Sequence, residues 1–220
     1  MQDNASQVSY WDRVAPEKRF SHPLRLEWLA QYLPNPAANI LDHGCGYGRT
    51  LAELSNHSYT NIFGADFSPA MLARSRNEVP NAKLICTDGR SLPFADGSFD
   101  LVLLFAVLTC IPSDTDQRAL LVETERVLRP AGMLYVSDLL LNTDARNRER
   151  YERFAEAHGC YGVFELPEGV LVRHHRKEWI EELTTPFQLL EYEPFKVTTM
   201  NGNTSAAFQY LGRKTKDRSA

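Results

Sequence analysis

The amino-acid sequence predicts an α/β fold, with a seven-stranded, mostly parallel sheet, helices on both faces and an antiparallel hairpin at its end. From residue 37 onward, short apolar runs alternate with amphipathic helical segments, which is typical of a parallel sheet covered by helices. The run "FDLVLLFAVLTCI", residues 99–111, is almost continuously apolar, as expected of a central strand buried on both faces. Strand-like composition returns after residue 185 around the turn signal "NGN", which predicts the closing hairpin.

The first two strand–helix units follow from local composition. Strands are expected at residues 38–44 and 60–66, and a helix is expected over residues 49–56. Ser68 is a suitable N-cap, and Pro69 suits a first helical turn because its missing N–H would have no helical partner there. The second helix is therefore expected to begin at Pro69.

Three more strands complete the parallel part of the predicted sheet. The third is expected at residues 82–88, the fourth within residues 99–111 and the fifth at residues 132–141. Residues 114–130 have the amphipathic pattern of a helix that Pro130 helps to end.

The composition indicates one globular domain. The chain has 220 residues, of which 43% are hydrophobic, and this is enough for one sizeable core. Its net charge of −4 offers no excess of positive charge to a phosphate backbone, so nucleic acid is an unlikely partner. The first 20 residues lack the apolar run of a signal peptide, and no stretch approaches the roughly 18 apolar residues of a membrane span. The four cysteines contain no CxxC pair, which argues against structural zinc and, with the missing signal peptide, predicts a cytoplasmic protein.

The single domain, residues 1–220, is expected to contain four segments. After Asp138 the sequence becomes charged and aromatic, with helix-prone ends, and we interpret this part as an insertion over the sheet. The segments are an N-terminal helical cap (1–36), a ligand-binding core (37–138), a lid insertion (139–184) and the closing hairpin (185–214).

Three glycines, Gly44, Gly46 and Gly48, lie between the first strand and the first helix of the core, in "ILDHGCGYGRT". Glycine adopts positive φ easily and lets the backbone approach a ligand closely, and open α/β sheets bind ligands at this edge. A dinucleotide fingerprint GxGxxG would need glycine at position 49, where the chain has Arg49. A tight turn without a ligand is the remaining alternative.

Acidic residues follow three of the predicted strands. Asp42, Asp66 and Asp88 lie at or near the strand ends, and Asp66 comes about 20 residues after the glycine loop, where a carboxylate can accept hydrogen bonds from both ribose hydroxyls. Such a group of carboxylates would repel a pyrophosphate and favour a ligand with a cationic centre and an amino group.

The segments "ILDHGCGYGRTLAEL", "IFGADFSPAMLARSR", "CTDGRSLPFADGSFDLVLLFAVL" and "ERVLRPAGMLYVSD" resemble, in order and spacing, the class I S-adenosylmethionine-dependent methyltransferases. The resemblance covers about residues 38–138 and implies a Rossmann-like fold. It places the glycine loop against the methionine end of S-adenosylmethionine, Asp66 on the ribose, Phe67 on the adenine and Asp88 on the adenine amino group, with Phe105 and Ala106 near the sulfonium. The candidate cofactor-binding residues are Tyr10, Trp11, Asp42, Gly44, Cys45, Gly46, Gly48, Asp66, Phe67, Ser68, Asp88, Gly89, Arg90, Phe105 and Ala106.

One departure limits what the resemblance implies. Many small-molecule members have a histidine shortly after the fourth strand, in a pattern like "VLHH", whereas this chain reads "VLTCI" with Thr109 and Cys110. Any role of that histidine is absent here.

Methyl transfer from a sulfonium is an in-line displacement with an activated donor, so a catalytic base is optional. The run "LVRHHRKEW" supplies the candidate catalytic residues Arg173, His174 and His175, and in an extended segment at most one of the two histidines would face a pocket. Arg173 could pair with an acceptor carboxylate. A solvated basic face is the competing interpretation, and a metal centre would need a third ligand that the sequence does not identify.

The lid insertion also supplies candidate acceptor-binding residues. Its aromatic residues suit a lid that excludes water and shapes an apolar pocket, although they could equally serve only to anchor the lid to the sheet. The candidates are Tyr151, Tyr161, Phe164 and Glu165.

The sequence therefore predicts an S-adenosylmethionine-dependent methyltransferase that acts on a small-molecule acceptor and releases S-adenosylhomocysteine. The alternatives are a tRNA or protein methyltransferase, a catalytically silent cofactor-binding partner subunit and, more remotely, a nicotinamide oxidoreductase. Oligomeric state stays open at this point, with a homodimer among the alternatives.

Overall fold

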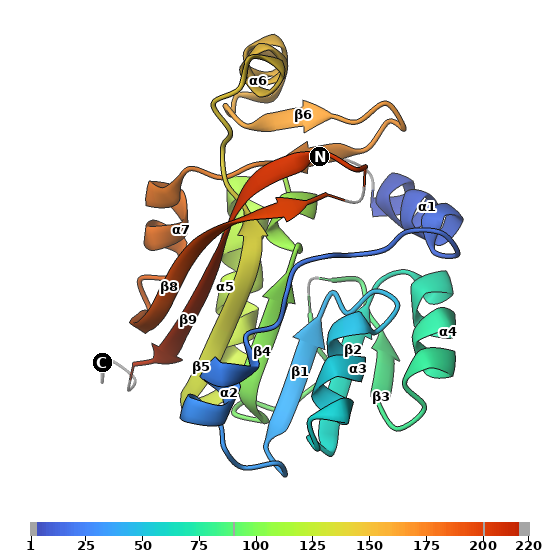
Figure 1. Cartoon of the computed structure of the whole chain (residues 1–220), viewed down its shortest axis with the longest axis vertical. Coiled ribbons are helices and arrows are strands. Elements are labelled where there is room, and N and C mark those ends of the chain that lie inside the picture. The colour runs from blue at the N-terminus through green and yellow to red at the C-terminus, as the bar shows by residue number, and fades with distance from the viewer. Residues whose placement is uncertain (1–3, 90, 200, 216–220) are drawn as a thin grey trace.

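The computed structural model describes residues 4–89, 91–199 and 201–215. Its main sheet has seven strands in the order β3-β2-β1-β4-β5-β9-β8 (Figure 1). The strands from β3 to β5 in this order run parallel, and β9 lies antiparallel between β5 and β8. This confirms the predicted sheet and its closing hairpin. The strands are β1 (Asn39–His43), β2 (Asn61–Asp66), β3 (Lys83–Cys86), β4 (Phe99–Phe105), β5 (Leu128–Leu139), β8 (Phe187–Thr198) and β9 (Thr204–Lys214).

Helices cover both faces of the sheet because side chains alternate along each strand. In β4, Leu101 and Leu103 pack on one face with α2 (Leu26–Tyr32) and α3 (Arg49–Asn56). Val102 and Leu104 pack on the other face with α5 (Asp114–Val127) and α7 (Lys177–Leu183). None of the helices in the described ranges has the length and apolar character that a membrane crossing requires.

The predicted start of α4 (Pro69–Glu78) is confirmed. Ser68 has extended φ and ψ, and its hydroxyl accepts a hydrogen bond from the Met71 N–H. The next predicted helix ends earlier than expected, at Val127, because β5 already begins at Leu128 and passes through an irregularity beside Pro130.

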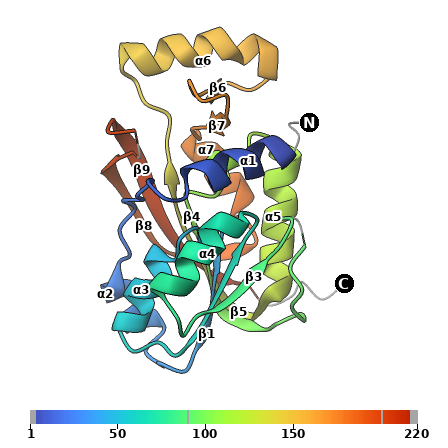
Figure 2. The same cartoon turned by 90° about the vertical axis from the view of Figure 1, so that its right-hand side faces the viewer.

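The segment after β5 folds into a separate layer at the carboxyl edge of the sheet (Figures 1 and 2). It contains α6 (Ala145–His158) and a two-stranded antiparallel hairpin, β6 (Val163–Glu165) and β7 (Leu171–Arg173). We call α6, β6 and β7 the lid. The hairpin lies in the middle of the predicted insertion, for which no strands were expected. The helix that follows, α7, packs on the core instead of on the lid.

Two further segments lie at the same edge of the sheet. Helix α1 (Asn4–Val14) lies between the core and the lid in Figure 2, and its Tyr10 packs with Tyr151 and Phe164 of the lid. From the other side, the β8–β9 turn approaches the N-terminal segment, where Lys18 Nζ donates a hydrogen bond to Asn201 Oδ1 at 2.8 Å. The carboxyl edge is therefore surrounded by α1, the lid and the β8–β9 turn.

Candidate functional site

The glycine loop between β1 and α3 needs glycine for steric reasons. Gly44, Gly46 and Gly48 have φ values of +81°, +53° and +85°. A Cβ at Gly44 would lie 2.6 Å from Val107 Cγ2, and a Cβ at Gly48 would lie 2.4 Å from Ser75 Oγ. The loop can therefore press against its surroundings only without side chains at these positions.

Asp66, at the end of β2, connects the glycine loop to α4. Its Oδ2 accepts a hydrogen bond from the Gly46 N–H and its Oδ1 accepts one from the Ser68 N–H, both at 2.8 Å. Each carboxylate oxygen has a second lone pair for a ligand hydroxyl. Burial raises the pKa of Asp66, and these backbone N–H groups act in the opposite direction.

A second carboxyl group, Asp42, is buried at the end of β1 with 2% of its surface exposed. Burial raises its pKa to about 7, while Arg49 acts to lower it and Asp66 acts to raise it. A cationic group bound near the loop would favour the charged form of both carboxyl groups.

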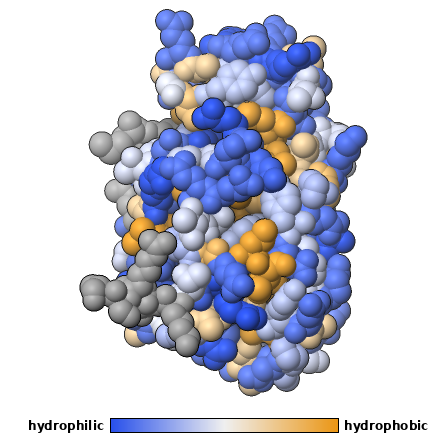
Figure 3. Space-filling view, turned by 90° about the vertical axis from the view of Figure 1, so that its left-hand side faces the viewer, coloured by the Kyte–Doolittle hydropathy of each residue, from blue (hydrophilic) through white to orange (hydrophobic). Residues whose placement is uncertain are grey.

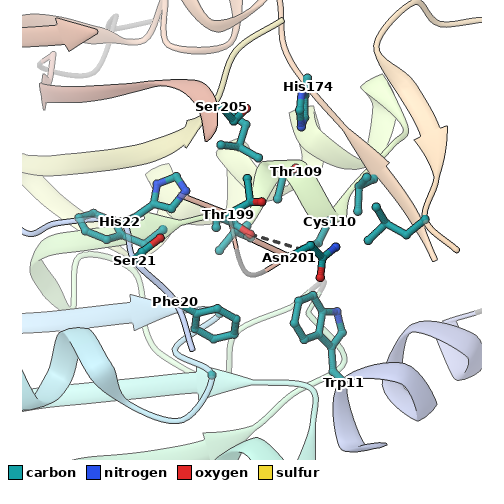
Figure 4. A pocket seen from close by; sticks show the side chains of 18 of the residues that line it. Trp11, Phe20, Ser21, His22, Thr109, Cys110, His174, Thr199, Asn201 and Ser205 are labelled. Atoms are coloured by element: carbon teal, nitrogen blue, oxygen red, sulfur yellow. Dashed lines mark hydrogen bonds between the residues drawn. The ribbon is translucent and has the colours of Figure 1, made fainter. Parts of the chain in front are cut away.

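Two cavities meet at this edge of the sheet. The first extends from the glycine loop to the lid and encloses about 1190 Å³ of empty space, including solvent at its mouth (Figure 4). The second lies over the ends of β3 and β4 and is lined by Thr87, Asp88 and Gly89. The residues that line both cavities are Gly44, Asp66, Phe67, Val107 and Cys110.

The first cavity has mostly apolar walls with polar groups at separate places. Trp11 and Phe20 lie across the cavity from His174 in Figure 4. Thr199 and Asn201 enter from the β8–β9 turn. The other residues that line it include Ser21, His22, Met71, Phe105, Ala106, Thr109, Leu139, Arg146, Arg150, Phe164, Leu166, Val172, Asn203 and Ser205.

The chain is similar to known proteins over most of its length. A family model described as a methyltransferase domain matches residues 41–136. A protein named O-methyltransferase rstn1, from Aspergillus nomiae, is 30% identical over 173 residues, which cover 74% of this chain and 73% of the relative. The chain belongs to the S-adenosylmethionine-dependent methyltransferases.

Solved methyltransferase structures share the fold. One from Methanosarcina mazei has a TM-score of 0.81 at 24% identity, over 86% of this chain and 98% of that chain. A 1,6-didemethyltoxoflavin-N1-methyltransferase from Burkholderia thailandensis has a TM-score of 0.68 at 16% identity, over 96% of this chain and 88% of that chain. The latter was solved with 1,6-didemethyltoxoflavin and S-adenosylhomocysteine bound.

The cofactor of this methyltransferase is S-adenosylmethionine, and the residues at the carboxyl edge fit it. The glycine loop leaves a side-chain-free surface for close approach, and Asp66 offers two lone pairs to hydroxyl groups. The buried Asp42 beside Asp66 suits a cationic ligand.

The structure brings many of the predicted cofactor-binding residues to the two cavities. The residues that line one or both are Trp11, Gly44, Gly46, Asp66, Phe67, Asp88, Gly89, Phe105 and Ala106. Others lie behind this surface: Gly48 packs on Ser75, Ser68 caps α4, and the Cys45 thiol is buried with a raised pKa. Tyr10 is buried between α1 and the lid, and burial raises its pKa to about 12. Arg90 lies outside the described residues.

Only one of the three predicted catalytic residues lines the first cavity. His174 does, whereas Arg173 donates to the Pro112 carbonyl and pairs with Asp114. The ring of His175 is held by the Leu139 carbonyl at 3.1 Å and by Gln117 at 3.0 Å. The expected roles of Arg173 and His175 at the acceptor are therefore not supported, because neither is among the described residues that line a cavity, and Arg173 Nη1 and both ring nitrogens of His175 are engaged elsewhere.

The alternation predicted for the two histidines agrees with this placement, since His174 faces the cavity and His175 faces the core. The interpretation of this run as a solvated face is wrong for Arg173, His174 and His175, whereas Arg176 and Lys177 are exposed. Arg173 and His174 are each 4% exposed and His175 is 1% exposed.

Of the predicted acceptor-binding residues, some lie at or next to the first cavity and others do not. Phe164 lines the first cavity, and Tyr151 lies behind His174, to which its hydroxyl is hydrogen-bonded at 2.6 Å. Tyr161 is 39% exposed and Glu165 is exposed, and neither is among the described residues that line a cavity. They are not supported as acceptor contacts.

Several residues of the cavity wall were missed in the sequence. Arg146 and Arg150 have helical i, i+4 spacing, which could have indicated one basic face of α6 turned inward. His22 has no local signal. Its Nδ1 atom is 2.9 Å from Ser137 Oγ, and burial lowers its pKa to about 4.

Proposed function

We propose that this methyltransferase transfers its methyl group to a small-molecule acceptor bound in the first cavity, between the glycine loop and the lid. One observation carries the proposal: the cavity is continuous from Gly44, Phe105 and Ala106 to the apolar residues of the lid. A cofactor on the loop and an acceptor under the lid would then be neighbours. The name of the Aspergillus relative, an O-methyltransferase, supports oxygen as the acceptor atom.

When bound, S-adenosylmethionine supplies an activated methyl group on a sulfonium. The chain's own task is to hold the acceptor in line with it and to exclude water. Under this proposal Asp66 and the glycine loop fix the cofactor, with Phe67, Asp88 and Gly89 on its adenosine side. Trp11, Phe20 and Phe164 form the dry walls around the acceptor.

Methyl transfer can be tested with methyl-labelled S-adenosylmethionine and separate metabolite, RNA and protein fractions of the source cell. Label in the metabolite fraction supports the proposal and yields a product to identify. Label only in RNA or protein would replace it with the tRNA or protein methyltransferase alternative. Binding of S-adenosylhomocysteine without any transfer would favour the silent partner subunit.

A matched pair of variants links the activity to the cavity. His174→Ala should lower turnover with unchanged affinity for S-adenosylhomocysteine, because His174 lines the acceptor side of the cavity. His57→Ala is the control, since His57 is exposed at the C-terminal end of α3. Equal turnover of the two variants would remove His174 from the acceptor site. A cytoplasmic location and a homodimer stay predictions that fractionation and sedimentation can test.

A further inference from the structure

The lid end of the first cavity concentrates hydrogen-bond donors and positive charge. Arg146 and Arg150 line this end together with His174. Asp66 lies on the opposite, cofactor side of the same cavity, with Asp42 buried behind the loop. The cavity therefore changes from acidic near the glycine loop to basic near the lid.

Arg150 is held in place by packing and not by an ion pair. Its guanidinium carbon lies 3.6 Å from the centre of the Phe164 ring, and its buried Nε atom has no hydrogen-bond partner among the described residues. Burial lowers the pKa of Arg150, whereas Tyr151, through its charge and a hydrogen bond to Arg150, and Asp144 act in the opposite direction. The Asp144 carboxylate already caps α6, because it accepts from the Asn147 N–H at 3.1 Å. In the described part of the chain, neither Arg150 nor Arg146 forms a salt bridge, although Asp144 acts electrostatically on both.

The hydrogen bonds around His174 define which ring nitrogen carries the proton. Asn142 Oδ1 accepts from the Ala206 N–H at 2.8 Å. The Asn142 amide nitrogen donates to the Leu140 carbonyl at 3.0 Å and to Ser205 Oγ at 2.9 Å, and it lies 3.3 Å from His174 Nδ1. The Tyr151 hydroxyl is 2.6 Å from the same Nδ1, and its oxygen accepts from the Asn142 backbone N–H at 3.3 Å. Because the Tyr151 oxygen already accepts a hydrogen bond and Nδ1 is its closest partner, the hydroxyl donates to Nδ1, which is therefore the acceptor.

The remaining ring nitrogen, Nε2, then carries the proton of the neutral imidazole. Burial lowers the pKa of His174 well below its usual value, and Arg150 acts in the same direction, so the neutral ring persists at neutral pH. Nε2 has no hydrogen-bond partner among the described residues, while the side chain lines the cavity (Figure 4). His174 therefore offers an N–H group to the acceptor. It does not offer a base.

Resting on the proposed function, we infer that the acceptor has an apolar body and an anionic oxygen group, which Arg150 and the Nε2–H of His174 hold at the lid end of the cavity. A carboxylate best matches the planar guanidinium. Tyr151 and Asn142 are positioning residues because they act through His174.

Binding to the protein saturated with S-adenosylhomocysteine tests this without turnover. The probes are 2-naphthoate and 2-naphthamide, which have the same ring system and differ in charge, with titration calorimetry at pH 7.5 as the measurement. We expect the carboxylate to bind at least tenfold more tightly, Arg150→Gln to lose this preference and Arg150→Lys to retain part of it. Arg148→Gln is the matched control, since Arg148 is exposed on the same helix, and it should keep the preference. Equal affinity for the two probes, no binding of either, or a preference that survives Arg150→Gln would overturn the inference.

The tautomer has an independent readout in nitrogen NMR of the His174 ring. Nδ1 should resonate in the unprotonated range and Nε2 in the protonated range at pH 7.5, and Tyr151→Phe should shift the Nδ1 resonance. A protonated Nδ1 would contradict the inference.

Label transfer then separates the two proposals. The metabolite fraction is divided on an anion exchanger before reaction with methyl-labelled S-adenosylmethionine. Label from the retained pool supports both proposals. Label only from the flow-through pool contradicts the anionic acceptor and leaves small-molecule methyl transfer intact, whereas label from neither pool contradicts the proposed function.

Discussion

Replacing Gly44 by alanine should destabilise the protein through two separate effects. The backbone at Gly44 has φ +81°, and a left-handed conformation costs a residue with a β-carbon about 1–2 kcal/mol. The new Cβ would also lie 2.6 Å from Val107 Cγ2, and an overlap of this kind costs about 1–3 kcal/mol after the neighbours have moved. The free energy of unfolding should therefore fall by about 2–5 kcal/mol, as measured by urea denaturation followed by circular dichroism.

Gly89 provides the matched control for the backbone effect. It has φ +76°, but no atom lies within 4 Å of where its Cβ would be, so Gly89→Ala should cost only about 1–2 kcal/mol. Replacing glycine by alanine also lowers the conformational entropy of the unfolded chain, which stabilises the folded state. This effect is the same for both variants and cancels when their free energies of unfolding are compared. In a Val107→Ala background the cost of Gly44→Ala should fall to that of Gly89→Ala. Equal costs of the two glycine variants in the wild-type background would refute the close-contact argument.

Three further predictions concern titratable groups. Asp66→Ala should weaken S-adenosylhomocysteine binding by about 1–3 kcal/mol in calorimetry, because its carboxylate would accept from the ribose, and unchanged affinity would contradict that role. With Asp42 at a pKa of about 7, S-adenosylhomocysteine affinity should rise as pH increases from 5.5 through 7 and then level off, and Asp42→Asn should flatten this profile. His22, with its pKa lowered to about 4, contributes stability that is complete above pH 6.5 and is lost as pH falls toward 4. The difference in free energy of unfolding between wild type and His22→Gln should therefore shrink by about 2 kcal/mol between pH 7.5 and 5, since the change is about 1.36 kcal/mol per pH unit below pH 6.5. A difference that stays constant over this range would contradict a buried, neutral His22.

The sheet could be predicted because its signals are local. The buried strand β4 is one continuous apolar run, and the Ser68–Pro69 pair marks the beginning of α4 within the sequence itself. The same holds for the glycine loop, where three positive φ values are needed within five residues. In each case neighbouring residues determine the conformation, so a local pattern is sufficient.

The acceptor side could not be predicted because it depends on contacts between distant segments. Arg173, His174 and His175 are adjacent in sequence, but only His174 lines the cavity. Gln117 and Asp114 of α5 engage the other two, and nothing in the lid sequence indicates those partners. The β8–β9 turn likewise has an ordinary turn sequence. It lines the cavity because β8 and β9 bring it close to the N-terminal segment, although the turn lies about 180 residues after α1 in the sequence.

The two sides of the cavity are also built from different kinds of element. The cofactor side consists of strand ends and the glycine loop, which continue directly into a core whose strand residues, such as Leu41 and Leu103, have no exposed surface. The side proposed for the acceptor consists of α1, the lid and the β8–β9 turn. Residues of α1 and the lid pack on each other in a cluster of their own, and these elements contain many exposed residues. Substitutions in the lid can therefore alter the charge and shape offered to the acceptor while Asp66 and the glycine loop keep their geometry. Residues that would select the proposed acceptor, such as Arg150 and His174, lie outside the segment that the methyltransferase family model matches.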